Sequence, residues 1–268
     1  APNAAPISLP DGPMASWRDL GDELDRWAEA GRRATLWWRD DDAAHATTAL
    51  ERLLTLRQRL DIPLALAAMP ALIDDPAAKA IADDAGATVL QHGYAHHNHA
   101  MASERKAELS DSRDPNIVMD ELVRGWQRLE SLFGNRAVPV LVPPWNRIGY
   151  SLVPRLGNAG YCGLSTYGPR PRRLAGPGVV LVNTHIDLID WRGHRSFVGD
   201  DNALELAVAH LTARRLNNNG DDEPTGLLSH HLAHDEACWD FIATLASATR
   251  AHPAADWLDA RTIFADTP

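Results

Sequence analysis

The feature that most constrains the fold of this chain is a repeated alternation of short apolar runs with amphipathic segments. Apolar runs of strand length stand at 34–38, 64–68, 88–91, 138–142, 161–165, 179–183 and 226–229. Between them, apolar residues recur every three or four positions, which predicts helices near 17–27, 47–60, 75–85, 115–133, 202–216 and 235–250. Strands that alternate with helices favour a parallel sheet with right-handed crossovers. We therefore expect an α/β fold.

Length and charge indicate one such unit and exclude two classes of partner. The 268 residues show no internal repeat and no convincing linker, so we expect a single domain over 1–268. A formal net charge of -10 opposes binding to nucleic acid. No apolar run approaches the roughly 20 residues needed to cross a bilayer, so we expect no membrane span.

The chain starts at Ala1 rather than at a methionine, which predicts a processed or trimmed start. We expect a cytoplasmic protein, with export after removal of a signal as the alternative. The oligomeric state is left open.

Polar clusters follow the predicted strands at five places along the chain. These clusters are 39–42, 92–96, 143–146, His185 with 187–191, and 230–231. In a parallel barrel the loops after the strands share the C-terminal face, where active sites assemble. We therefore expect the five segments to converge on one site.

Three consecutive aspartates, Asp40, Asp41 and Asp42, follow the first predicted strand. Adjacent carboxylates repel one another, so a buried strand end tolerates them only with a compensating cation or proton. The alternative is an acidic N-cap of the next helix, a position that Asp favours. From this segment alone, we consider a compensated strand end and a helix N-cap equally probable.

His92 and His96 follow the third predicted strand at a spacing of four residues. Neutral imidazoles at that spacing can reach one metal ion from a helical turn or a compact loop. The alternative is a surface loop that is rich in histidine. A carboxylate with histidines is the usual ligand set of a catalytic zinc ion, so an Asp with these two His favours the metal interpretation.

His230 and His231 end the last predicted strand. One histidine there is often a core residue, but two at the expected site favour a general acid, because histidine titrates near neutral pH. Asp187 or Asp190 could orient such a histidine. The chain has no GxSxG elbow and no glycine-rich phosphate loop, which argues against a serine hydrolase and a nucleotide-binding protein of those types.

In their order along the chain, these segments resemble the motifs of the polysaccharide deacetylases of carbohydrate esterase family four, the NodB-homology group. The matching segments are the paired Asp within 40–42, the H-x-x-x-H of 92–96, the Pro-aromatic pair of 144–146, the D-x-x-D-W of 187–191 and the Leu-x-His of 228–230. They extend from about residue 36 to 231, most of the chain. The chain thus resembles an outlying member of this family.

The resemblance implies a distorted (β/α)7 barrel with parallel strands and one divalent metal ion, usually Zn2+, held by one Asp and two His. Carried over, the metal ligands are Asp42, His92 and His96, and Asp41 is the general base. The other frame of the motif makes Asp40 the base and Asp41 the ligand. We prefer the first frame, because Ala43 then takes the place of the family's small glycine.

The resemblance also implies that His230 is the general acid, oriented by Asp190, with His231 as the alternative acid. A backbone N–H near 145–146 would stabilise the oxyanion of the reaction. The side chains expected to contact substrate are those of Trp145, Asn146 and Trp191.

Three departures from the family pattern concern the substrate more than the chemistry. Val142 stands where the family has an Arg before the proline, so Arg39 or Arg147 would have to steer the base. Asp40 replaces a Phe of the first motif and adds negative charge. His231 replaces the Asp that follows the acid histidine.

The sequence therefore predicts a metal-dependent hydrolase that removes N- or O-linked acetyl groups from a carbohydrate or another small acetylated substrate. One alternative is a metal-dependent amidase that acts on a small non-sugar amide. A second is a barrel that binds carbohydrate without turnover. Only a deacetylase releases acetate.

Overall fold

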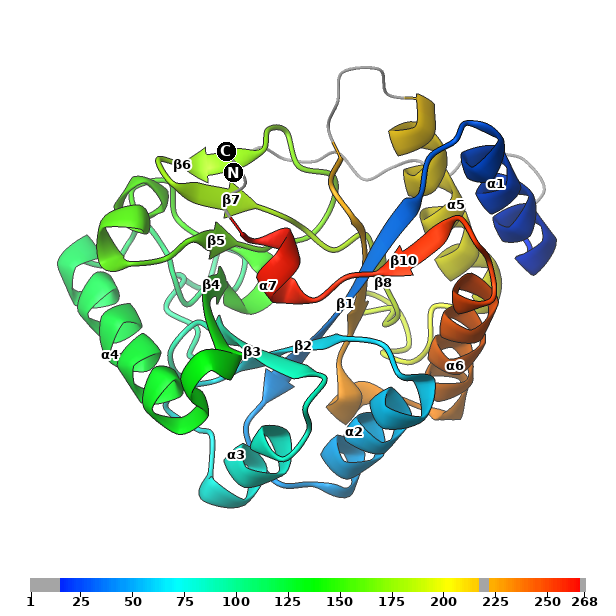
Figure 1. Cartoon of the computed structure of the whole chain (residues 1–268). Coiled ribbons are helices and arrows are strands. Elements are labelled where there is room, and N and C mark those ends of the chain that lie inside the picture. Colours follow the sequence, from blue (N-terminus) through cyan, green and yellow to red (C-terminus); the bar gives the residue numbers. More distant parts are fainter. Residues whose placement is uncertain (1–14, 217–221, 266–268) are drawn as a thin grey trace.

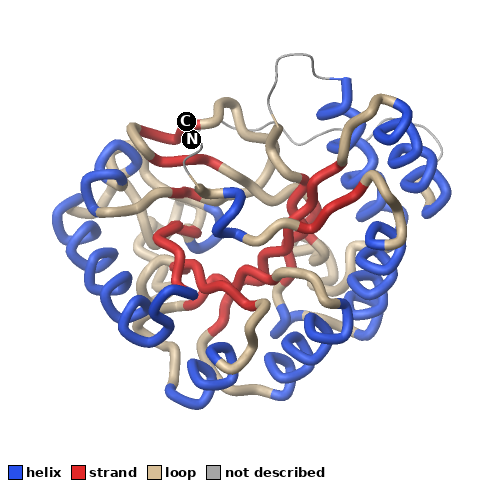
Figure 2. Tube along the Cα trace, viewed as in Figure 1, coloured by secondary structure: helices blue, strands red, loops and turns tan. Residues whose placement is uncertain are grey.

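The computed structural model describes residues 15–216 and 222–265, which form a curved sheet surrounded by helices (Figures 1 and 2). The helices are α1 (Trp17–Glu29), α2 (Thr48–Leu60), α3 (Asp75–Ala82), α4 (Pro115–Phe133), α5 (Asp200–Leu216), α6 (Glu236–Arg250) and α7 (Ala260–Ile263). The strands are β1 (Ala34–Ala43), β2 (Leu64–Ala68), β3 (Ala87–His92), β4 (Ala137–Val142), β5 (Gly163–Leu164), β6 (Leu174–Gly176), β7 (Val179–Leu181), β8 (Ile186–Asp187), β9 (Thr225–Ser229) and β10 (Ala255–Trp257).

The strands lie in the order β6-β7-β5-β4-β3-β2-β1-β9-β8, and β10 pairs with the start of β1. Every pair is parallel except β6 with β7. Among the described residues, no strand pairing joins the two end strands, β6 and β8, so hydrogen bonds do not close the sheet. Helices α1 to α6 surround the strands on the outside (Figure 1). The expected α/β fold with parallel strands is confirmed.

Strand β1 shows how the sequence separates an inner from an outer layer. Successive side chains of a strand point to opposite faces. Trp37 accordingly packs inside the curved sheet with Leu90 and Val140, whereas Leu36 and Trp38 pack in the outer layer under the helices. Because both faces are covered, the start of β1 is a continuous apolar run rather than an alternating one.

The last described helix, α7, fills the inside of the sheet at the end where the strands begin. In Figure 1 it lies in the middle of the ring that the strands form, between β4 and β10. Phe264, directly after α7, is 2% exposed, and its ring lies edge-on to Trp37 with centroids 5.9 Å apart. A Cβ at position 163 would collide with the Phe264 ring, which explains Gly163 in β5.

The structure corrects the sequence predictions at two points. Strand β1 continues through the three aspartates to Ala43, so they lie in the strand and not after it. The interpretation of the aspartates as a helix N-cap is wrong, because Thr47 caps α2 with a side-chain bond from the N–H of Leu50 at 3.1 Å. The short elements β6, β8, β10 and α7 were not predicted. In the described part of the chain, no helix is both long and apolar enough to cross a membrane.

We expect Phe264→Ala to lower the free energy of unfolding by about 3 to 5 kcal/mol, because it removes a large buried ring and leaves a cavity. Urea denaturation followed by tryptophan fluorescence measures this change. Phe264→Leu keeps most of the volume and should cost less than half as much. Equal stability of the alanine variant and the native protein would contradict the packing role of α7.

Candidate metal centre and active site

The end of β1 contains a bulge that brings two of its aspartates to the same side. Strand alternation places Arg39 and Asp41 on the inner side and Asp40 on the outer side. The register between β1 and β2 shifts between Asp40 and Ala43, and Asp42 has a φ of 73°. A bulge of this kind redirects a side chain. Asp42 therefore faces the histidines that follow β3 instead of the outer layer.

Asp42, His92 and His96 form a compact group whose ligand atoms all lie within 4.8 Å of one another. Asp42 Oδ1 is 3.1 Å from His92 Nε2 and 3.4 Å from His96 Nε2. The Nδ1 of His92 lies 3.0 Å from the carbonyl oxygen of Val142. When His92 is neutral and its Nδ1 carries the hydrogen that it donates to the carbonyl, Nε2 has a lone pair to offer a metal ion in place of the hydrogen bond to Asp42. The group fits a divalent ion such as zinc.

The electrostatics of this group also favour a cation. Burial by itself raises the pKa of Asp42, but the hydrogen bond and charge of His92, with the charges of His230 and His96, outweigh burial and lower it. Burial lowers the pKa of His92, but the hydrogen bond to Asp42 and the charges of Asp41 and Asp42 outweigh burial and raise it. The carboxylates that raise the pKa of His92 would equally stabilise a bound cation.

Arg39 fixes the other inward aspartate, Asp41. Its guanidinium is fully buried and binds Asp41 in a bidentate manner, with Nε and Nη2 at 2.8 and 3.0 Å from the two carboxylate oxygens. The remaining donors reach Ser165 Oγ at 2.7 Å and Asn146 Oδ1 at 2.8 Å. Arg147 instead donates to the carbonyl of Lys106. Arg39 is therefore the arginine that positions Asp41.

The remaining aspartate of the three, Asp40, points into the outer layer and is hydrogen-bonded there. It accepts hydrogen bonds from Ser229 Oγ at 2.5 Å and from the backbone N–H of His231 at 3.1 Å. Its other oxygen lies 2.5 Å from Nδ1 of His231, which is 2% exposed. This geometry supports the frame in which Asp41 and Asp42 face the site, and it turns His231 away from the site.

His230 lies on the same side as Asp41, with its Nε2 4.0 Å from Asp41 Oδ2. The Trp191 ring lies edge-on to His230 at 4.8 Å, and the Trp191 indole N–H donates to Asp187 at 3.0 Å. Asp190 instead accepts the backbone N–H groups of residues 192 and 193 at 3.2 and 2.9 Å. Among the described residues, the Nδ1 of His230 is buried without a hydrogen-bond partner, so the structure does not bring Asp190 to His230.

Trp145 and Asn146 lie on a short turn after β4 with an unusual backbone. Trp145 packs against the ring of the predicted ligand His96 with centroids 4.3 Å apart. The side chain of Asn146 faces inward to Arg39, and its backbone N–H donates to the carbonyl of Pro143 at 2.8 Å. The described non-glycine residues with positive φ are Asp42, Asp61, His96, Trp145, Asn146 and Arg195. Four of these six belong to the candidate site, and such strain concentrates at functional sites.

The sequence analysis did not identify Glu108, which fixes the backbone of the loop that carries His96. This carboxylate is 1% exposed and accepts the backbone N–H groups of Tyr94, Ala95 and His97 at 3.0, 2.7 and 3.4 Å. A Cβ at Gly93, where φ is 53°, would collide with this carboxylate and with Pro144. No motif in the sequence indicates Glu108.

A second group of residues could also hold a metal ion, but its hydrogen-bond pattern differs. This group consists of His185, His210 and Glu223. The backbone N–H of Gly226 donates to Nδ1 of His185 at 3.0 Å. A neutral His185 must then carry its hydrogen on Nε2, which lies 3.3 Å from Glu223. That nitrogen has no lone pair to offer a metal, in contrast to Nε2 of His92. We interpret this second group as a structural polar cluster.

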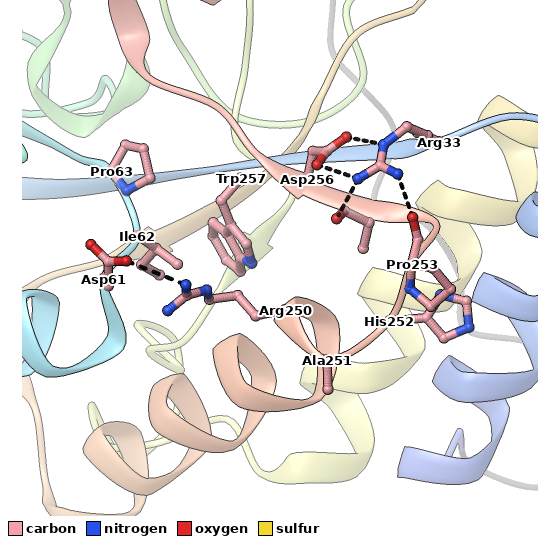
Figure 3. A pocket seen from close by; sticks show the side chains of 11 residues that line it. Arg33, Asp61, Ile62, Pro63, Arg250, Ala251, His252, Pro253, Asp256 and Trp257 are labelled. Carbon is pink, nitrogen blue, oxygen red and sulfur yellow. Dashed lines mark hydrogen bonds and ion pairs between the residues drawn. The ribbon is translucent and has the colours of Figure 1, made fainter.

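A hollow of about 430 Å3 lies at the other end of β1 and is also excluded as the active site (Figure 3). Its two arginines are already paired. Arg33 binds Asp256, and Arg250 lies 3.3 Å from Asp61. With its charges neutralised in this way, the hollow offers no cluster of reactive groups.

No family model and no curated protein matches the sequence. Solved structures do match. A candidate polysaccharide deacetylase from Mycobacterium smegmatis is 18% identical, with a TM-score of 0.62 over 87% of this chain and 88% of that one. The Bc1960 peptidoglycan N-acetylglucosamine deacetylase is 14% identical, with a TM-score of 0.55 over 91% and 98%.

The chain has the fold of the family-four polysaccharide deacetylases. The predicted distorted (β/α)7 barrel and the predicted resemblance are thus confirmed at the level of the fold. A family 4 acetyl xylan esterase from Clostridium thermocellum, solved with a cobalt ion, is also similar, at 13% identity and a TM-score of 0.51 over 86% of this chain and 90% of that one. A further similar structure is a pseudoenzyme of the same family, BA3943 from Bacillus anthracis, at 14% identity and a TM-score of 0.55 over 87% and 66%.

We expect Glu108→Gln to weaken zinc binding by about 10- to 100-fold, because its amide cannot accept all the backbone N–H groups that position His96. Competition with a chelating dye measures the affinity. Glu104→Gln is the matched control, since Glu104 is an exposed carboxylate on the same loop. Equal affinities for the two variants would contradict the role of Glu108.

The polar cluster should make the fold sensitive to acid. Burial, then the charges of Arg214 and Arg170, lower the pKa of His185 to about 3. An unfolded chain takes up this proton below about pH 6.5 and the folded chain does not, so stability falls as the pH falls through that value. We expect His185→Gln to remove up to about 2 kcal/mol of the stability lost between pH 7 and pH 5.

Denaturation in urea at the two pH values measures this difference. Burial raises the pKa of the neighbouring Glu223, which works in the opposite direction and is present in both proteins. An identical loss of stability in the variant and the native protein would show that His185 is protonated in the fold.

Proposed function

We propose that this protein is a metal-dependent hydrolase that removes acetyl groups from a carbohydrate substrate. The observation that supports this most is the group of Asp42, His92 and His96, in which Nε2 of a neutral His92 can offer its lone pair to an ion. A carboxylate and two imidazoles bind zinc and leave a coordination position open. Asp41 and His230 lie next to each other, with His230 Nε2 4.0 Å from Asp41 Oδ2, and the charge of His230 acts on Asp42 of that group.

When bound, the divalent ion supplies a Lewis acid that polarises the acetyl carbonyl and activates water. Asp41, held by Arg39, accepts a proton from the attacking water. His230 donates a proton to the nitrogen or oxygen of the leaving group as the acyl bond breaks. The products are acetate and a free amine or alcohol.

The surrounding residues position these groups. The backbone N–H of Asn146 is already donated to Pro143, so we assign the oxyanion contact to the N–H of Trp145. Trp191 packs against His230 and is 41% exposed. Its exposed indole ring can therefore stack on a sugar ring. Asp187 binds Trp191 and lies near enough to His230 for their charges to interact, so we propose Asp187 in the orienting role first assigned to Asp190.

A barrel without turnover is the second candidate, because one similar structure is described as a pseudoenzyme. The specific feature in this chain is Val142, where the family has an arginine. Arg39 compensates for it with the bidentate bond to Asp41, which favours an active enzyme.

The test is acetate release from acetylated chito-oligosaccharides by the zinc-loaded protein. We expect His230→Ala and Asp41→Asn each to lower the rate by about 10^2- to 10^4-fold, since each removes a proton-transfer group. Asp40→Asn is the matched control in the same triplet, and it should retain most of the activity because Asp40 lies in the outer layer.

Three outcomes would contradict the proposal in different ways. Release of a carboxylic acid other than acetate from non-sugar amides, with no acetate from glycans, would indicate the amidase. Glycan binding that persists after chelation, with no product, would indicate the barrel without turnover. A loss of activity in Asp40→Asn that matches Asp41→Asn would overturn the assigned frame.

A further inference from the structure

Three arginines belong to the rim of the candidate site, that is, to the loops that carry its residues, although the protein as a whole is acidic. The formal net charge of the chain is -10. Nevertheless, Arg147 directly follows the turn of Trp145 and Asn146, and Arg192 directly follows Trp191. Arg105 belongs to the extended loop that follows the histidines after β3. Three loops, after three different strands, thus each contribute an arginine.

Contacts of Arg147 and of the residues next to the arginines tie the three loops to the site. The Arg147 guanidinium donates to the carbonyl oxygen of Lys106 at 2.7 Å, which holds it beside the segment that carries Arg105. Asn146, one residue before Arg147, bonds to Arg39 inside the site. Trp191, one residue before Arg192, packs on His230. The three arginines therefore lie on loops beside the reactive groups, and the charges of Arg105 and Arg192 act on Arg147.

These arginines differ from most others in the chain because they are not neutralised. Arg52, Arg57 and Arg215 each lie within 2.7 Å of a carboxylate oxygen. Within residues 15–216 and 222–265, no carboxylate lies within ion-pair distance of the arginines of the rim. Burial, and then the charges of Arg105 and Arg192, lower the pKa of Arg147. Like charges held together in this way favour an anionic ligand.

We propose that the substrate carries an anionic group, a carboxylate or a phosphate, beside its acetylated residue, and that Arg147 binds this group with Arg105 and Arg192. Guanidinium groups recognise carboxylates and phosphates through paired, charge-assisted hydrogen bonds. Long-range attraction to the rim would also counteract the repulsion of an anion by the acidic surface. This inference rests on the proposed hydrolase function and specifies its substrate class.

The test compares three forms of one acetylated chito-oligosaccharide: neutral, oxidised to a carboxylate at C6, and phosphorylated at C6. We expect kcat/KM for an anionic form to exceed that for the neutral form by about tenfold or more, mainly through KM, and the advantage to shrink as salt is added. The two anionic arms distinguish a carboxylate from a phosphate.

Arg147→Gln should remove most of that advantage. Arg59→Gln is the matched control, because Arg59 is exposed on α2, changes the net charge equally and should leave the ratio of the two rates unchanged. Equal kcat/KM for neutral and anionic forms, or an advantage that survives in Arg147→Gln, would overturn the inference.

Binding of the same three oligosaccharides by calorimetry separates this inference from the proposed function. If no oligosaccharide releases acetate, the proposed function fails. Tighter binding of an anionic form that is lost in Arg147→Gln would still support the anion site, and equal affinities would overturn it.

Discussion

The buried ion pair between Arg39 and Asp41 is the interaction on which the candidate site depends. A fully buried guanidinium is costly unless all its donors are satisfied, and here they are satisfied by groups from three parts of the chain. The same arginine ties the end of β1 to Ser165, after β5, and to Asn146, after β4. Holding Asp41 therefore also holds the turn that presents Trp145.

Strand alternation and one bulge then divide the three aspartates among different tasks. Asp40 faces outward and pairs with His231, and these are two of the three positions at which this chain departs from the family pattern. The charge added by one departure is thus compensated by the other, away from the reactive groups. Asp41 faces inward because it lies two residues after Arg39. Asp42 joins it only because the bulge, with a φ of 73°, interrupts the alternation.

Much of the fold could be predicted from the sequence, because the long apolar and amphipathic segments carry strong periodicity. The helix over 115–133 and the strand over 64–68 were predicted with their observed bounds. Strands β6 and β8, of three and two residues, are too short to show any period. The extent of β1 was missed because charged residues rarely continue a buried strand, and only Arg39 makes this possible.

The candidate site was predictable in its reactive groups but not in their supports. Asp42, His92 and His96 carry recognisable spacing, and the structure brings them together. Neither the partner of Asp190 nor the role of Glu108 follows from spacing, because each depends on loop geometry. Hydrogen bonds to the backbone also distinguish His92, a candidate metal ligand, from His185, a structural residue. A sequence does not show which imidazole nitrogen carries the hydrogen.

The most direct test of the account is the metal content of the purified protein, measured by elemental mass spectrometry beside an Asp42→Ala, His92→Ala double variant. The account predicts about one zinc ion or similar divalent ion per chain, lost in the double variant while His185 and Glu223 remain intact. No bound metal in the native protein after zinc is added, or an equal amount in the double variant, would contradict the assignment of this site.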